Sequence, residues 1–526
     1  MKKFLRNFFS GYFLVLLMLL IEAGVLLFIQ FDMNDLVSRL LGNSASSESM
    51  KLIIAATYIL LRLIGFIVAL IIFFKIINRP ENPEFKIPWI VGMLLLPFFF
   101  SVIFIIFGNH HLMRKEKRIL KETNEIYPTH FILNDDTKNN LDNAVGAFTY
   151  LNKVTKLGIH SNNRVTYYKN GETFFPELMN ALRSAKEFIF MEFFIISDGA
   201  YWKEVRDILI EKADAGVEVR LIYDDMGCGG SIAARTPKIL RKHDIKCYKF
   251  HPFRPILSGI YNNRDHRKIV IVDHQAAFTG GMNLADEYGN LEKRFGYWKD
   301  SMVRIEGSAV SNLIAIFLQN FDFASGKVSD YDHYLNFQYP IFDEPNYVAP
   351  FGDGPGGVDN ALVGEQTYIN ILNYAKREVF ISTPYLVPTY GLIDALRNAS
   401  LRGVKVHLIV PGIPDKKMVY KVAESNFKYL LDAGVKIYRY TPGFNHMKTI
   451  LADDTLAMVG TINFDFRSLV HHFECGALLY QCSCLSDIKK DFEEMIAASS
   501  EVPTDFKLKK STNRLCSLIK IISPLL

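Results

Sequence analysis

The chain contains the same six-position string twice, with identical internal spacing and 180 residues apart. The string reads HxKxxxxDxxxxxxG(G/T)xN, and its copies run from His266 to Asn283 and from His446 to Asn463. Histidine is the side chain whose ordinary pKa lets it act as base, acid or nucleophile near neutral pH. The doubled string therefore predicts two histidines, with their lysines, working together in one site.

These residue types suit the transfer of a phosphoryl group. One histidine attacks phosphorus to form a phosphohistidine, and the other protonates the leaving alcohol and then deprotonates the incoming one. The lysines supply positive charge and the asparagines supply neutral donors where phosphoryl oxygens gain negative charge. The residues predicted for catalysis are His266, Lys268, Asp273, His446, Lys448 and Asp453, with Asn283 and Asn463 binding phosphate.

No metal and no cofactor is expected for this chemistry. Neither string offers a second histidine or a cysteine at the spacing of metal ligands, and lysine is a poor ligand at neutral pH. The six cysteines show no framework pattern of disulfides or metal ligands.

The repeat extends well beyond the two strings. Residues 182–190 (LRSAKEFIF) match 372–380 (LNYAKREVF), and 215–222 match 402–409. Each half reads as helices alternating with apolar strands, followed by the strand that carries the histidine. We therefore predict an α/β fold of two duplicated sandwich halves, 161–340 and 341–505, each with a parallel or mixed sheet, that share one active site.

Two segments beside the strings are predicted to be loops. The first half has ten extra residues within 251–264, which we interpret as a loop over the substrate cleft. The glycine-rich stretch 350–357 is either a mobile flap over the site or a connection between the halves.

The first 110 residues are of a different kind, and we predict a membrane segment there. Three apolar runs, about 11–31, 53–74 and 88–107, are long enough to span a bilayer. A basic connector, 111–160, follows them. Basic residues flank both ends of this segment, so three spans cannot satisfy the charge bias at both. The cluster beside the large domain is the stronger one, and it places the catalytic part in the cytoplasm.

The net charge of +5 comes from the C-terminal tail, 506–526, which carries five basic residues and no acidic one among apolar side chains. Such a tail either lies on an anionic membrane surface or docks against the catalytic domain. The overall charge is too modest to indicate nucleic-acid binding.

The residues around both strings allow a narrower comparison. Asn262 to Tyr288 (NNRDHRKIVIVDHQAAFTGGMNLADEY), Thr383 to Pro388 (TPYLVP) and Gly443 to Ser468 (GFNHMKTILADDTLAMVGTINFDFRS) resemble bacterial cardiolipin synthases of the phospholipase D superfamily. One departure is His472, where that family more usually has asparagine.

The resemblance implies that two phosphatidylglycerol molecules give cardiolipin and glycerol, in a multi-pass protein of the bacterial cell membrane. His266 would form the phosphatidyl-histidine, and His446 would act as acid and then as base. Asp300 and Glu474 would each orient one of these histidines by accepting its second ring proton, although the pairing stays open.

Other functions remain open at this stage. A membrane phospholipase D would hydrolyse the same intermediate, and a related phosphatidyltransferase would exchange the headgroup for another alcohol. A nucleic-acid phosphodiesterase and a non-catalytic scaffold are disfavoured by the apolar segments and by the intact histidines and lysines. The oligomeric state and the range of acceptor alcohols stay undetermined.

Overall fold

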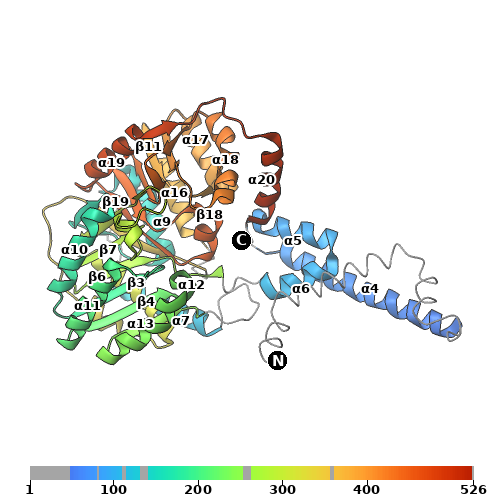
Figure 1. The fold of residues 1–526 in the computed structure, drawn as a ribbon, viewed down its shortest axis with the longest axis horizontal. Coiled ribbons are helices and arrows are strands. Elements are labelled where there is room, and N and C mark those ends of the chain that lie inside the picture. The colour runs from blue at the N-terminus through green and yellow to red at the C-terminus, as the bar shows by residue number, and fades with distance from the viewer. Residues whose placement is uncertain are drawn as a thin grey trace. The chain divides into compact units, whose positions relative to one another are not determined.

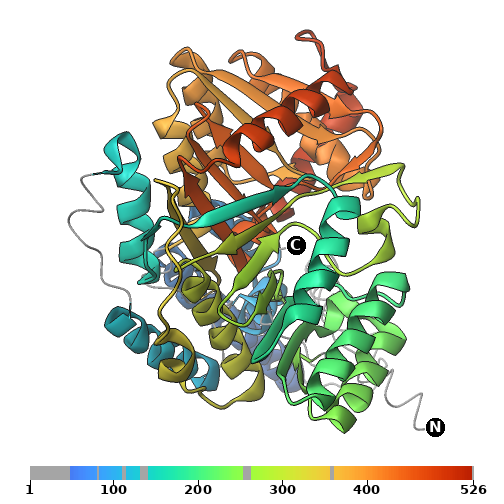
Figure 2. The same cartoon turned by 90° about the vertical axis from the view of Figure 1, so that its left-hand side faces the viewer.

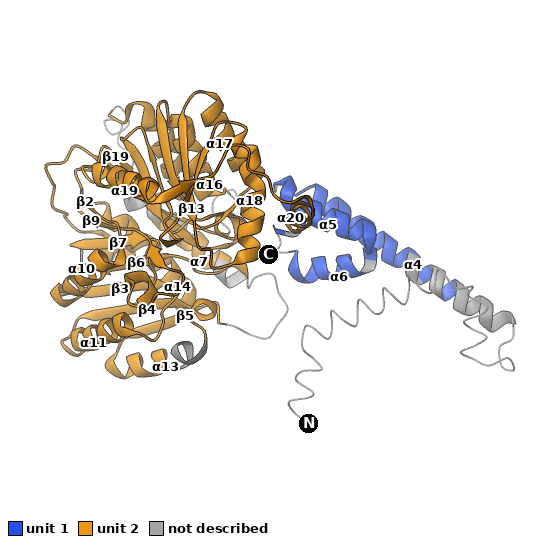
Figure 3. Ribbon diagram, turned by 45° about the horizontal axis from the view of Figure 1, so that its top comes forward, with its two compact units in different colours: residues 1–110, 254–260, 520–526 blue, residues 111–253, 261–519 orange. Residues whose placement is uncertain are grey.

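The computed structural model describes residues 48–79, 82–108, 114–130, 140–252, 262–355 and 361–523. They form two compact units (Figure 3). The smaller unit comprises residues 1–110, 254–260 and 520–526, and the larger one comprises 111–253 and 261–519. The predicted span 11–31 and most of the predicted loop within 251–264 lie outside the described residues.

Among its described residues, the smaller unit contains the helices α4 (Glu48–Ile77), α5 (Pro83–Leu95) and α6 (Pro97–Phe107). They pack through a small apolar cluster in which the rings of Trp89 and Phe104 meet edge to face, 5.1 Å apart. Most of the apolar side chains that are described in α4 are exposed: Phe66 is 61% exposed and Ile71 63%. The predicted span 53–74 lies within α4.

The predicted span 88–107 is wrong as a single helix. Leu96 leaves the helical conformation, with φ −137° and ψ 77°, and separates α5 from α6. The physical reason is Pro97, because the ring of a proline disfavours the helical conformation in the residue before it.

Within the described part of the chain, no helix combines the length and the apolar character needed to cross a membrane.

The first half of the larger unit is built on a seven-stranded mixed sheet. In spatial order its strands are β2 (Arg164–Tyr168), β9 (Met302–Glu306), β7 (Ala276–Gly280), β6 (Lys268–Val272), β3 (Phe188–Phe193), β4 (Glu218–Asp224) and β5 (Lys246–Phe250). The β3, β4 and β5 strands are parallel, and the other neighbours are antiparallel. Helices that connect these strands are α10 (Gly171–Ser184), α11 (Ala200–Asp214) and α13 (Gly230–Leu240).

The second half repeats this plan in a nine-stranded sheet. Its strands are β1 (His160–Ser161), β10 (Tyr347–Asp353), β19 (Glu474–Tyr480), β17 (Leu456–Gly460), β16 (Thr449–Ala452), β11 (Glu378–Ser382), β13 (Lys405–Pro411), β14 (Lys436–Tyr440) and β20 (Ser499–Glu501). Its helices are α16 (Val363–Tyr374), α17 (Tyr390–Leu401), α18 (Lys417–Leu431) and α19 (Leu485–Ala497). The seven middle strands follow the order of the first half, which confirms the predicted duplication (Figure 1).

Matching turns show how closely the halves repeat. Gly216 and Gly403 occupy the same place in the two halves, just before β4 and β13, with φ +92° and +95°. Glycine is the residue that adopts this left-handed conformation at little cost. The Gly-Val pattern seen in the sequence therefore marks the same turn twice.

The two halves lie side by side (Figure 2), and one apolar core is continuous between them. Helix α14 (Val310–Ser325) lies in that core, and nearly all of its side chains are buried. Its Phe317 stacks on Phe190 of β3 at 4.8 Å, and apolar residues of β16, β17 and β19 belong to the same cluster. Burial on this scale holds the halves in one fixed arrangement.

The structure differs from the prediction in two segments, the connector 111–160 and the glycine-rich stretch 350–357. The described part of the stretch 111–160 includes α7 (Arg114–His130), which packs against α14 of the first half, and α9 (Val145–Thr155), which packs against α16 and β10 of the second. It is therefore more than a connector. The predicted flap is wrong for Pro350–Asp353, because these residues belong to β10 and pair with β19, whereas 356–360 lie outside the described residues.

The C-terminal tail forms helix α20 (Lys510–Ile522). Its Cys516 is fully buried, and the thiol donates a hydrogen bond to the carbonyl oxygen of Lys421 on α18, 3.4 Å away. Leu515 and Leu518 on the same helix remain exposed. Phe506 of the same tail also packs against the larger unit, with its ring 5.7 Å from that of Phe427 on α18. These contacts agree with docking of the tail against the catalytic domain.

Candidate active site

Each catalytic histidine is held by its backbone to the other half of the molecule. The amide of His266 donates to the carbonyl oxygen of Phe473 at 2.8 Å, and the amide of His446 donates to that of Lys299 at 2.7 Å. Each acceptor immediately precedes one of the predicted carboxylates, Glu474 or Asp300. The fold therefore delivers a histidine from one half to a carboxylate from the other.

The two histidine–carboxylate pairs are crossed between the halves. Nδ1 of His266 lies 2.9 Å from both carboxylate oxygens of Glu474, and Nδ1 of His446 lies 2.6 Å from Oδ2 of Asp300. An ionised carboxylate only accepts, so Nδ1 of His266 donates to Glu474 when that carboxylate is ionised, which leaves the lone pair of the ring on Nε2. Burial holds the pKa of Glu474 well above its usual range. Nδ1 of His446 lies between Asp300 and the ammonium of Lys448, which is 2.6 Å away. The pairing that the sequence left open is thus resolved in the structure.

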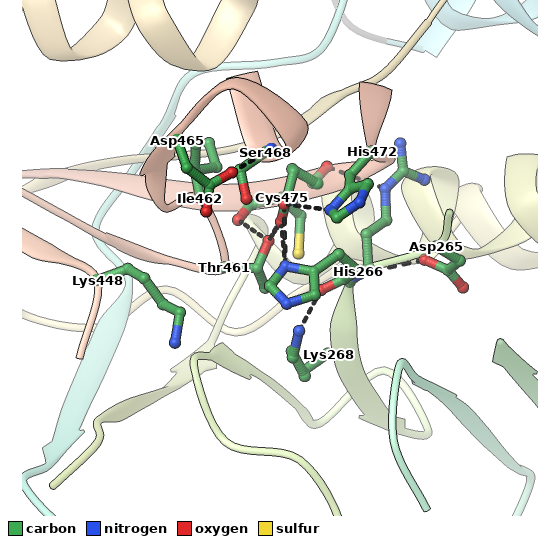
Figure 4. Close-up of polar contacts among 12 residues, drawn as sticks. Asp265, His266, Lys268, Lys448, Thr461, Ile462, Asp465, Ser468, His472 and Cys475 are labelled. Atoms are coloured by element: carbon green, nitrogen blue, oxygen red, sulfur yellow. Dashed lines mark hydrogen bonds and ion pairs between the residues drawn. The ribbon is translucent and has the colours of Figure 1, made fainter. Parts of the chain in front are cut away.

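The lysines of the two strings lie beside the histidines; Figure 4 shows Lys268 next to His266. The ammonium of Lys268 donates to the carbonyl oxygen of His266 at 2.5 Å, and that of Lys448 to the carbonyl oxygen of His446. Both side chains are completely buried. The charge of Lys448 also acts on His266, so the two strings contribute to one electrostatic environment.

Burial shifts the protonation of all four groups. Desolvation, followed by the charge of Lys268, holds the pKa of His266 well below its usual range. Desolvation and the charge of Lys448 lower the pKa of His446 to about 4. Desolvation also lowers the pKa of Lys268 to about 8 and that of Lys448 to about 7. At neutral pH both imidazoles are therefore uncharged, as attack on phosphorus requires.

The two asparagines of the strings differ in their surroundings. Oδ1 of Asn283 accepts from the amide of Ile195 at 3.0 Å, and its Nδ2 donates to the hydroxyl of Tyr288 at 2.6 Å. Oδ1 of Asn463 is buried without a hydrogen-bond partner among the described residues. Phosphate binding by these amides stays a prediction.

The aspartates of the strings lie at the far ends of their strands from the histidines. The carboxylate of Asp273 accepts from three successive backbone amides, 186–188, at 2.8 to 2.9 Å. Asp453 does the same for 376–378 at 2.7 to 3.0 Å. Both aspartates therefore tie the start of a neighbouring strand, β3 or β11, and a direct part in the chemistry stays untested.

Sequence reasoning missed two residues that contact the pair of His266 and Glu474. Thr461, at the second glycine position of the string, donates from its hydroxyl to Glu474. His472 lies two residues before Glu474, and its ring is 5.4 Å from that of His266 (Figure 4). His472 had a signal in the sequence, because it lies two residues before Glu474 and alternate residues of an extended chain point to the same side.

Comparisons with known proteins agree with the duplicated site. The family model described as "Cardiolipin synthase, PLD-like domain" matches residues 178–317 and 368–496. Cardiolipin synthase 2 of Bacillus cereus is 32% identical over 469 residues, covering 88% of this chain and 90% of that protein. The chain belongs to this cardiolipin synthase family.

Two further proteins, one known by sequence and one by crystal structure, are similar to most of the chain. An uncharacterized protein of Streptococcus mutans is 41% identical over 457 residues, covering 86% of this chain and 98% of that protein. The crystal structure of phosphatidylserine synthase from Haemophilus influenzae matches with a TM-score of 0.54 at 15% identity, covering 72% of this chain and 99% of that one. This likeness in structure confirms the fold of the larger unit.

Proposed function

We propose that this chain is a cardiolipin synthase that transfers a phosphatidyl group from one phosphatidylglycerol to another. Membership of the family supports this reaction. The observation that carries the proposal is the crossed arrangement of His266 with Glu474 and of His446 with Asp300. It supplies one nucleophile and one acid–base group, each with its own carboxylate.

The first half-reaction breaks a P–O bond and forms a P–N bond. Nε2 of His266 attacks phosphorus, and the ring becomes a cation whose Nδ1–H faces Glu474. His446 gives a proton to the departing glycerol. The negative phosphate of the bound lipid raises the pKa of His446 from its low value, which prepares the ring for this step.

The second half-reaction runs in the opposite sense. His446 accepts the proton of a terminal glycerol hydroxyl on the second lipid, whose oxygen attacks phosphorus and releases His266. Lys268 and Lys448 stabilise the charge on the phosphoryl oxygens in both steps. Two displacements at phosphorus give overall retention of configuration. The choice of His266 as the nucleophile follows the resemblance, since the geometry of the two pairs is nearly symmetric.

We further propose that the protein works at the bacterial cell membrane, as a multi-pass protein with its catalytic part in the cytoplasm. The exposed apolar surface of α4 supports membrane contact, because soluble surfaces rarely expose so many large apolar groups together. Leu515 and Leu518 on the basic helix α20 support contact with anionic lipid. A lipid surface also favours an alcohol over water as the acceptor.

A product assay tests the reaction directly. Purified full-length protein in detergent micelles containing phosphatidylglycerol is expected to yield cardiolipin and glycerol in equal amounts, and added glycerol should reverse the reaction. Phosphatidic acid as the main product would instead identify a hydrolase. His266→Ala and His446→Ala are both expected to abolish turnover, and survival of either variant would exclude the two-histidine mechanism.

A further inference from the structure

The imidazole of His472 lies beside the active site and has no role in the mechanism described above. His472 follows a short π-helix, Arg467–His471, and precedes β19. Its ring is 91% buried, yet among the described residues neither ring nitrogen has a hydrogen-bond partner. A buried polar group without a partner costs about 1–3 kcal/mol, so its presence needs an explanation.

The groups around the ring of His472 suggest an explanation for its burial. Nδ1 of His472 lies 3.6 Å from Oε1 of Glu474, which is too far for a hydrogen bond, and the same carboxylate is 2.9 Å from Nδ1 of His266. One ligand atom from each of the three residues lies within 4.8 Å of the other two. Two histidines and a carboxylate are the ligand set of several zinc sites that keep a fourth position open.

We propose that His472, His266 and Glu474 form a site for a divalent transition metal ion such as Zn²⁺, and that its occupation switches the transferase off. Ligands about 2.0–2.1 Å from a tetrahedral zinc lie about 3.4 Å apart. The measured separations of 2.9 and 3.6 Å bracket that value. The remaining adjustment falls on the ring of His472, which no hydrogen bond restrains.

The surroundings limit the affinity of the site. Lys268 faces His266 and Glu474, and the charges of Arg467 and Arg264 act on His472. These cations oppose a bound metal, so we expect reversible inhibition rather than a permanent structural ion. Mg²⁺ and Ca²⁺ prefer oxygen ligands and are not expected to bind.

Inhibition follows from the chemistry of His266. A metal on one ring nitrogen leaves the proton on the other, so no lone pair remains to attack phosphorus. Binding through Nδ1 moves the ring proton that now faces Glu474 to Nε2, so the ring stays neutral and its attacking nitrogen is protonated. The ion therefore competes with catalysis for the same imidazole. This inhibitory effect rests on the proposed function, whereas binding of the ion does not.

Binding is tested with Co²⁺ on the metal-free, full-length protein in detergent. We expect one Co²⁺ per chain, with the strong visible absorption of a four-coordinate ion. The His472→Asn variant should lose that absorption. The control variant His333→Asn should retain it, because His333 is exposed and is not one of the proposed ligands. This readout needs no turnover, so it stands even if the protein does not make cardiolipin.

Inhibition is tested with Zn²⁺ in the cardiolipin assay, each variant being compared with its own metal-free rate. Zn²⁺ should inhibit the unmodified protein reversibly, with recovery on adding a chelator, while Mg²⁺ has no such effect. His472→Asn should raise the half-inhibitory Zn²⁺ concentration by at least about tenfold. Equal Zn²⁺ sensitivity and Co²⁺ absorption in His472→Asn and the unmodified protein, or an equal loss in His333→Asn, would overturn the proposal.

Discussion

Glu474→Gln tests the electrostatic role assigned to the carboxylate beside the nucleophile. Glutamine has nearly the same shape and still accepts a hydrogen bond from Nδ1 of His266, but it carries no charge. Forming the phosphohistidine places a positive charge on the ring, 2.9 Å from Glu474. At that distance and an effective dielectric constant of about 20, the attraction amounts to about 6 kcal/mol.

The neutral amide retains a hydrogen bond worth about 1 kcal/mol. The net loss of about 5 kcal/mol corresponds to a fall in kcat of roughly 10³- to 10⁴-fold. Initial rates of cardiolipin formation at saturating phosphatidylglycerol measure it, with a melting curve to show that the variant is folded. Glu424→Gln is the matched control, because Glu424 on α18 is a buried carboxylate paired with Lys421 of the same helix and with Arg439 of β14. A folded Glu474→Gln variant within tenfold of the unmodified rate would refute the reasoning.

Three further predictions follow from the same geometry. Asp300→Asn should lower kcat by about 10²- to 10⁴-fold on phosphatidylglycerol. The single-turnover release of nitrophenol from a phosphatidyl nitrophenyl ester should fall far less, because nitrophenol leaves without a proton; an equal loss in this single-turnover rate would contradict the assignment of His446 as the acid. Lys448 and Lys268 must be protonated to bind phosphate, so kcat/KM should fall as the pH rises through their lowered pKa values of about 7 and 8; a profile that stays flat up to pH 9 would exclude this role. Asp273→Ala removes the acceptor for three backbone amides and should destabilise the fold by about 3 kcal/mol, seen as a lower Tm; an unchanged Tm with lost turnover would instead place Asp273 in the chemistry.

The repeat was sufficient to predict the duplicated architecture. The fixed offset between the halves predicted two copies of one sheet, and both sheets share the same order of seven strands. The resemblance to the phospholipase D superfamily, rather than the repeat, indicated that Asp300 and Glu474 orient the histidines. Their crossed pairing could not be read from one half alone, because it depends on backbone contacts of Phe473 and Lys299 with the opposite half.

Other features depended on local rules that the sequence did contain. The break of the third apolar run at Leu96 follows from Pro97, which hydropathy alone does not register. Similarly, the role of Asp273 could not be seen from spacing, because the amides it binds lie about 85 residues earlier in the chain. His472 was noticed only as a departure from the family pattern, although its position two residues before Glu474 places both side chains on one side.

The account rests on His266 forming the covalent intermediate while His446 moves the proton. Rapid quenching at alkaline pH, with phosphatidylglycerol labelled in the phosphate, followed by mass spectrometry of peptides, tests it most directly. The label is predicted on the peptide containing His266, and it should disappear on adding excess glycerol. Label on the peptide containing His446, or turnover without any labelled histidine, would contradict the account.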